Sequence, residues 1–286
     1  CIRDRRIIDW RRYVYDIHLP TVITQGRVKT TPSSSPPDSR GNRLRKQVLD
    51  PSRQLAVFDL ENTLIASNVV SSWGYLATKR LSSQDRLKVI TKTVLEAPSM
   101  LAMDRRDRTD FLRNFYRKYE GAPVLQIDED SLEMFNEFIL AKSFPAAIRR
   151  VREHRALGHR TLLITGALDF VVQPLKPLFD EILAPSLEIN GGKYSGRMTH
   201  VPPIGETRAA ALRSYADENN LNLKESIAYA DSTSDLPMLE AVGFPVAVNP
   251  ETKLATLARR RGWLVENFQP ISGSPKKTLP LGSKKE

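Results

Sequence analysis

Short apolar runs alternate with longer segments of helical periodicity along most of the chain. The first run, Leu55–Phe58, is closed by the polar residue Asp59 and is typical of a buried parallel strand. The alternation predicts an α/β fold with a doubly wound, mostly parallel sheet. Further strands are predicted at Arg160–Ile164, Glu181–Ala184, Ser226–Ala230, Pro245–Val248 and Trp263–Glu266, and an antiparallel hairpin at Leu187–Met198.

A long helical stretch separates the first two predicted strands. Residues 68–143 place apolar positions at helical spacing, with Pro98 and Gly121 between the segments. This pattern predicts a helical cap inserted into an α/β core made of residues 51–67 and 144–269. Cap helices are predicted at Val69–Leu81, Gln84–Leu95, Arg108–Tyr119 and Leu132–Leu140, and core helices at Phe144–Leu157, Leu168–Leu178, Ile204–Asn219, Ser234–Val242 and Glu251–Arg260.

The two ends of the chain differ in composition from its middle. Residues 1–50 combine a predicted amphipathic helix, Ile7–Ile17, with a Ser- and Pro-rich segment, residues 30–45, that indicates a flexible linker. The helix either docks on a partner domain or a membrane surface, or packs on the core of this protein. Residues 270–286 are polar and basic without periodicity, which predicts a disordered tail.

The net charge of +10 lies mainly in these ends. Residues 1–50 contribute +6 and residues 270–286 contribute +3, so the middle of the chain is nearly neutral. A basic fold would indicate nucleic-acid binding, but charge confined to the tails does not, and no nucleic-acid partner is predicted. The hydrophobic share of 41% supports a buried core. No apolar run reaches the roughly 18 residues of a transmembrane helix.

The chain contains one cysteine and therefore no internal disulfide, which favours the reducing cytoplasm. Its first residues, CIRDRR, lack the apolar centre of a signal peptide. Because the first residue is Cys rather than Met, we expect a processed product or a piece of a longer chain.

Polar residues directly follow three of the predicted strands. Asp59, Thr165 and Asp231 each come just after an apolar run, and Asp235 lies one helical turn after Asp231. Since neighbouring strands lie about 4.8 Å apart, these groups are expected to meet at one edge of the sheet. A single Asp at such a place is typical of a turn or a helix cap, but three coinciding strand ends favour a site.

Carboxylates gathered at one point favour a hard divalent cation such as Mg²⁺. A carboxylate beside this cation can attack phosphorus and form an aspartyl-phosphate. A hydroxyl group and a cationic side chain would then hold the phosphoryl oxygens. The pattern therefore indicates phosphoryl-transfer chemistry.

Several segments together resemble the haloacid dehalogenase superfamily, and in particular its phosphoserine-phosphatase-like branch, subfamily IB. The resemblance covers about residues 53–268 and implies a Rossmann-like core with the cap inserted after the first motif. The segments that carry it are Phe58–Leu64 (first motif), Leu163–Gly166 (second motif), Ala230–Leu239 (fourth motif), Gly243–Pro250 and Gly262–Trp263.

This resemblance implies an Mg²⁺-dependent hydrolase, a phosphatase of a small phosphomonoester that works through an aspartyl-phosphate. The roles are carried over position by position. They are Asp59 as the nucleophile and a metal ligand, Glu61 as the general acid/base whose backbone carbonyl also binds the metal, Thr165, Gly166 and Arg208 as phosphate-binding residues, and Asp231 and Asp235 as metal ligands.

Four positions depart from the family pattern. The family usually has Asp at Glu61, Lys at Arg208 and Gly at Ala230. Phosphoserine phosphatases also place a Glu where this chain has Asn68, so phosphoserine itself is not the expected substrate. The alternative is a catalytically weakened module that binds a phosphorylated ligand, or an appendage of a larger, lipid-metabolic multidomain enzyme.

Other polar groups carry less weight. The four histidines are scattered and form no metal-ligand pattern, so we interpret them as surface or packing residues. The basic cluster Arg105, Arg106 and Arg108 lies in the predicted cap. It either meets an anionic substrate or forms a solvated helix face, and we favour the solvated face.

Overall fold

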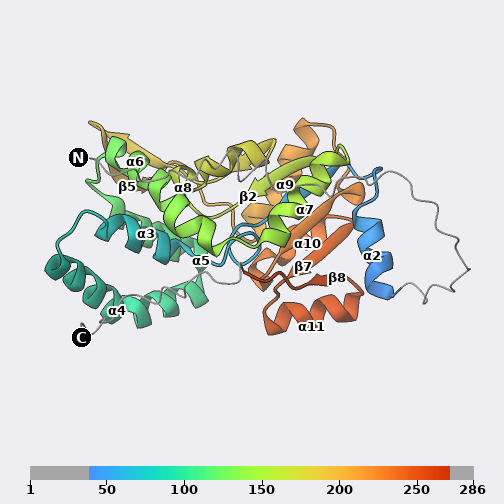
Figure 1. Cartoon of the computed structure of the whole chain (residues 1–286), viewed down its shortest axis with the longest axis horizontal. Coiled ribbons are helices and arrows are strands. Elements are labelled where there is room, and N and C mark those ends of the chain that lie inside the picture. The colour runs from blue at the N-terminus through green and yellow to red at the C-terminus, as the bar shows by residue number, and fades with distance from the viewer. Residues whose placement is uncertain (1–38, 271–286) are drawn as a thin grey trace, which may run out of the picture.

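Six parallel strands form the centre of the protein, whose computed structural model describes residues 39–270 (Figure 1). Their order is β3-β2-β1-β6-β7-β8, so β1 lies between β2 and β6. This confirms the predicted α/β fold with a parallel sheet. The predicted helix Ile7–Ile17 lies outside the described residues. The strands are β1 (Leu55–Phe58), β2 (Arg160–Ile164), β3 (Glu181–Leu183), β6 (Ile227–Ala230), β7 (Phe244–Val248) and β8 (Leu264–Glu266).

The central strands are apolar along their whole length because both faces of the sheet are covered. All four residues of β1 are buried, and alternate residues contribute to two separate hydrophobic clusters. Ala56 and Phe58 face the side of α7 (Pro145–Ala156), while Leu55 and Val57 face the side of three helices. These three are α9 (Glu206–Glu218), α10 (Leu236–Ala241) and α11 (Thr252–Arg261).

The chain between β1 and β2 is helical, as the sequence predicts for that stretch (Figure 1). Its division from the core as a separate cap stays a prediction. None of the helices in residues 39–270 combines the length and apolar character of a membrane span. The inserted helices are α3 (Val69–Thr78), α4 (Ser83–Arg106), α5 (Arg108–Tyr116), η1 (Arg117–Tyr119), α6 (Val124–Met134), the π-helical turn η2 (Phe135–Ile139) and η3 (Leu140–Lys142).

Two of these helices differ from the predictions. The structure continues α4 through Pro98, whereas the predicted helix ended at Leu95. Pro98 is exposed, and α4 has no buried residue, so the ring occupies solvent and the missing N–H costs one hydrogen bond at the surface. The helix predicted at Leu132–Leu140 instead begins at Val124, directly after Pro123.

A helix also occupies part of the predicted linker. Residues 40–48 form α2 (Arg40–Val48), so the prediction of a flexible linker up to Arg45 was wrong there. The side chain of Ser39 caps the helix by accepting a hydrogen bond from Asn42. Leu44 and Val48 pack on the core. Because this segment is short and mostly polar, its sequence did not indicate an apolar face.

Buried polar groups under α7 form one continuous hydrogen-bond chain. His159 Nε2 lies 2.9 Å from the carbonyl oxygen of Asp50, so it must donate there, and Nδ1 of the same ring must accept. His154 Nδ1 donates to it across 2.8 Å, which leaves His154 Nε2 to accept from the Tyr229 hydroxyl at 2.6 Å. Arg150 donates to the Tyr229 oxygen at 3.4 Å. These directions apply to neutral rings, and burial, which lowers the pKa of both histidines, favours the neutral form.

Most of the remaining elements connect β2 to α9. A short helical segment follows β2, and the antiparallel hairpin confirms the prediction at Leu187–Met198. Backbone hydrogen bonds between Tyr194 and both Gly121 and Ala122 fix this hairpin on the inserted helices. The elements are α8 (Asp169–Val172), η4 (Gln173–Leu178), β4 (Leu187–Asn190) and β5 (Lys193–Met198), with η5 (Leu223–Glu225) and η6 (Thr233–Asp235) on either side of β6.

Candidate active site

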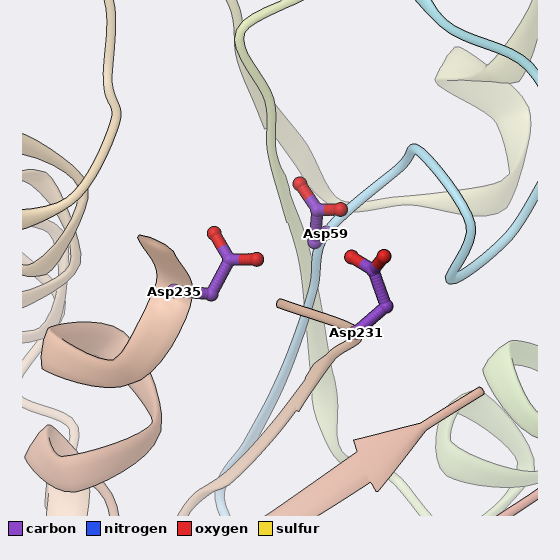
Figure 2. Close-up of side chains that lie close together, drawn as sticks. All are labelled: Asp59, Asp231 and Asp235. Atoms are coloured by element: carbon purple, nitrogen blue, oxygen red, sulfur yellow. The ribbon is translucent and has the colours of Figure 1, made fainter. Parts of the chain in front are cut away.

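Three carboxylates converge at the carboxyl ends of the central strands. Asp59 follows β1 and is held there by a backbone hydrogen bond to Tyr229 of β6. Asp231 directly follows β6, and Asp235 lies at the start of α10. One oxygen atom from each of the three carboxylates lies within 4.8 Å of the others (Figure 2). The structure thus brings together Asp59 and Asp231, which the sequence places at strand ends, and Asp235, which follows one helical turn later.

A buried arginine completes this cluster. Nη1 of Arg208 lies 2.7 Å from Oδ1 of Asp59 and also pairs with Asp235. Its Nε donates to the carbonyl oxygen of Pro203 at 3.0 Å, which fixes the guanidinium plane. Since a buried cation is costly without partners, these contacts explain how Arg208 can occupy the place where the family pattern has Lys.

Burial and mutual repulsion disfavour ionisation of these carboxylates. Removal from water raises the pKa of Asp59 well above its usual range, while Arg208 acts in the opposite direction. Burial, and then the charge of Asp235, raise the pKa of Asp231 to about 7. A hard cation that takes oxygen ligands, such as Mg²⁺, would stabilise the ionised form of these closely spaced carboxylates.

Glu61 lies beside the cluster but is not one of its three carboxylates. Its Oε2 accepts a hydrogen bond of 3.1 Å from Nη2 of Arg108. Nη1 of the same guanidinium group pairs with Asp104. Burial raises the pKa of Glu61 to about 7 against the effects of Arg108 and Arg208. The turn after β1 carries Asn62 at a φ of 55°, a left-handed conformation that Asn tolerates better than most residues.

Thr165 and Gly166 form a buried corner at the end of β2. The Thr165 hydroxyl oxygen accepts a hydrogen bond from the backbone of Ala167 at 3.1 Å. The inserted helices close over this corner, because the Tyr116 hydroxyl donates to the Gly166 carbonyl at 2.6 Å. A Cβ atom on Gly166 would lie 3.1 Å from Leu112, so a glycine suits this close contact.

One sequence interpretation was wrong, because Arg108 is not part of a solvated face but points at Glu61. Arg105 and Arg106 are exposed, as expected. The sequence feature that could have indicated this orientation is the spacing of Arg108, Leu112 and Tyr116. It places all three on one side of α5, toward the site.

Asn68, at the position where phosphoserine phosphatases place a Glu, caps α3. Its Oδ1 accepts from the backbone and the hydroxyl of Ser71 at 2.9 and 2.8 Å. The side chain is therefore engaged in a local structural contact.

Comparisons with known proteins agree with this geometry. Residues 56–240 match the family model described as haloacid dehalogenase-like hydrolase. A histidinol-phosphatase of Neisseria meningitidis is 28% identical over 76% of this chain and 100% of its own length. Phosphoserine phosphatase SerB1 of Mycobacterium tuberculosis is 30% identical over 75% of this chain and 70% of its own.

Among solved structures, a Bordetella pertussis protein of unknown function shares the fold. It has a TM-score of 0.66 and 24% identity, and the similarity covers 75% of this chain and 98% of that one.

Proposed function

Because the chain belongs to the haloacid dehalogenase-like hydrolase family, we propose that it is an Mg²⁺-dependent phosphatase of a small phosphomonoester. The observation that supports this most is the meeting of Asp59, Asp231 and Asp235 within 4.8 Å, with Arg208 against two of them. The relatives named histidinol-phosphatase and phosphoserine phosphatase support the same class of reaction. The single cysteine supports a cytoplasmic location.

Asp59 is the nucleophile in this proposal. One of its oxygens forms a bond to phosphorus while the bond from phosphorus to the leaving oxygen breaks, which gives an aspartyl-phosphate. Glu61 donates a proton to the leaving oxygen and later accepts one from the water that attacks the phosphorus. That second attack breaks the bond to Asp59, releases phosphate and restores both carboxyl groups.

The other residues hold the phosphoryl group. In this proposal Arg208 and the hydroxyl of Thr165 contact its oxygens, together with the Gly166 backbone. Asp59, Asp231, Asp235 and the backbone carbonyl of Glu61 would hold Mg²⁺. When bound, this ion would offset the repulsion between the carboxylates and the incoming phosphate.

Phosphoserine is not the proposed substrate. Asn68 carries no charge for a substrate ammonium group, and its amide oxygen already caps α3. Arg108 instead presents a half-exposed cation beside Glu61. This contact favours a phosphomonoester without an ammonium group close to its phosphate.

The test is steady-state hydrolysis of a generic aryl phosphate with Mg²⁺. The parent should turn over, and Asp59→Asn should lose activity by at least about 10³-fold, since the nucleophile is gone. Asp217→Asn, an exposed residue on α9, is the matched control and should keep parental activity. A parent as inactive as Asp59→Asn over a broad panel of phosphomonoesters would contradict the proposal and favour the binding-module alternative.

A further inference from the structure

A basic cavity lies between the inserted helices and the β4–β5 hairpin. It has a volume of about 520 Å³, which is in the range of small-molecule sites. One wall comes from α5 and η1, and the other from β5 and the segment that follows it. The lining residues are Arg113, Arg117, Gly196, Arg197, Met198, Thr199, His200 and Val201.

The lining of this cavity contains three arginines and a histidine. None of the lining residues is acidic. Among residues 39–270, Arg117 and Arg197 form no salt bridge. Arg113 pairs with Asp110 of its own helix, with the charged atoms 3.7 Å apart. Three arginines that line one space repel one another, so an anion between them would be stabilised.

The backbone holds the two walls in place. Gly196 has a φ of +73°, and a Cβ atom there would lie 3.0 Å from the Cα and carbonyl oxygen of Arg117. This close approach requires glycine, and it brings β5 directly onto η1. Arg117 and Arg197 are thus carried by fixed, adjacent backbones, which lowers the entropy cost of binding an anion between them.

We propose that this cavity binds a phosphate-bearing organic anion at a site separate from the catalytic carboxylates. The planar guanidinium groups match the geometry of phosphate oxygens, and Met198 and Val201 offer an apolar wall for the organic part. The two sites lie on different faces of α5: Leu112 packs against Gly166, whereas the next residue, Arg113, lines the cavity.

A ligand in this cavity contacts two parts of the protein that also build the active site. Arg113 belongs to the same helix as Arg108, which pairs with Glu61. Val201 comes two residues before Pro203, whose carbonyl oxygen holds Arg208. The site therefore joins the inserted helices to the segment that supports the phosphate-binding arginine.

Calorimetric titration with inorganic pyrophosphate, in EDTA and without Mg²⁺, tests the proposal. Without the metal the catalytic cluster presents carboxylates to an anion and repels it, so binding there is suppressed. The parent should bind one pyrophosphate per chain, and Arg117→Gln/Arg197→Gln should bind at least about 10-fold more weakly. Arg213→Gln/Arg259→Gln removes the same charge from exposed positions elsewhere and should bind within twofold of the parent.

Two further titrations complete the test. Asp59→Asn should keep pyrophosphate binding, because that residue is not in the cavity. Phenyl phosphate should bind more tightly than inorganic phosphate if Met198 and Val201 contact the organic part.

Three results would overturn the proposal: no pyrophosphate binding by the parent, equal losses in the two double variants, or equal affinities for phosphate and phenyl phosphate. Each is measured without Mg²⁺ and without turnover. A failure here is thus distinct from a failure of the proposed phosphatase activity.

Discussion

Among single residues, Glu61 is the one whose length matters most. Its carboxylate reaches Arg108 at 3.1 Å, whereas the usual Asp is one methylene shorter and could not make this contact without movement of the backbone or the helix. The intrinsic pKa values of Asp and Glu differ little, about 3.9 against 4.3, so the chemistry itself is preserved. The position of the carboxyl group is what changes.

We therefore expect Glu61→Asp to lower kcat on an aryl phosphate, by up to about 10²-fold for a misplacement near 1 Å. Glu61→Gln removes the proton-transfer group and should lower kcat by about 10²–10⁴-fold. Steady-state kinetics with Mg²⁺ measure both. An increase in kcat for Glu61→Asp would mean that Glu61 is a damaged general acid/base rather than an adapted one.

At the scale of elements, the hydrogen-bond chain under α7 joins helix, sheet and the segment before β1. Burial lowers the pKa of His154 to about 2 and also lowers the pKa of His159, with nearby cations adding to both effects. The unfolded chain takes up protons near the ordinary His pKa of about 6.5, and the folded chain does not. The contribution of these neutral rings to the free energy of unfolding is complete above about pH 7. It falls as the pH drops below 6.5.

Between pH 7 and pH 5 His154 should therefore lower the unfolding free energy, whereas Asp231 and Glu61, whose pKa values are raised to about 7, act in the opposite direction. For His154 alone the loss by pH 5 is about 2 kcal/mol, since one pKa unit corresponds to about 1.4 kcal/mol. Urea denaturation at both pH values should show this loss as a difference between the parent and His154→Gln, because the buried carboxyls titrate in both proteins. His200→Gln, an exposed histidine, should keep the parental dependence on pH. Parallel pH profiles for the parent and His154→Gln would contradict the prediction.

The same elements show what the sequence can predict. The central strands were found because four consecutive apolar residues, as in β1, are buried on both faces. The first part of helix α6 was not predicted, because buried Asp130 and Ser131 interrupt its apolar face just before Leu132. Helix α2 was missed because its contacts, such as Arg45 with Glu266 at 2.9 Å, join residues far apart in sequence.

The candidate site also has a part that the sequence could predict and a part that it could not. Asp59 and Asp231 follow the ends of neighbouring strands, so topology alone brings them together, and Asp235 joins them from the start of α10. The pairing of Arg108 with Glu61 depends on how α5 is rotated against the sheet. Helical spacing gives a face but not the neighbour that the face contacts, so this pairing required the structure.

For the molecule as a whole, the proposed Mg²⁺ site would link metal binding to folding. Mg²⁺ that binds the folded state alone should raise Tm by mass action, and at 100 times Kd the gain in unfolding free energy is about 2.7 kcal/mol. Asp231→Asn should abolish this rise. In EDTA above pH 7 the same variant should be as stable as the parent or more so, because burial and Asp235 disfavour the ionised form of Asp231.

Thermal denaturation with and without Mg²⁺ measures these effects. Asp217→Asn has the same chemistry at an exposed position and should respond to Mg²⁺ as the parent does. Equal Mg²⁺ responses in the parent and Asp231→Asn would show that the metal binds elsewhere.

The strand order also determines when this site can first exist during synthesis. Leu55 of β1 pairs with Arg160, and Ala56 pairs with Ile227. At about 5–20 residues per second, the ribosome makes β1 roughly 5 to 20 seconds before its first partner strand, and β6 later still. Throughout that interval the apolar strand before Asp59 has no sheet to enter. A nascent chain thus carries Asp59 long before the three carboxylates can come together.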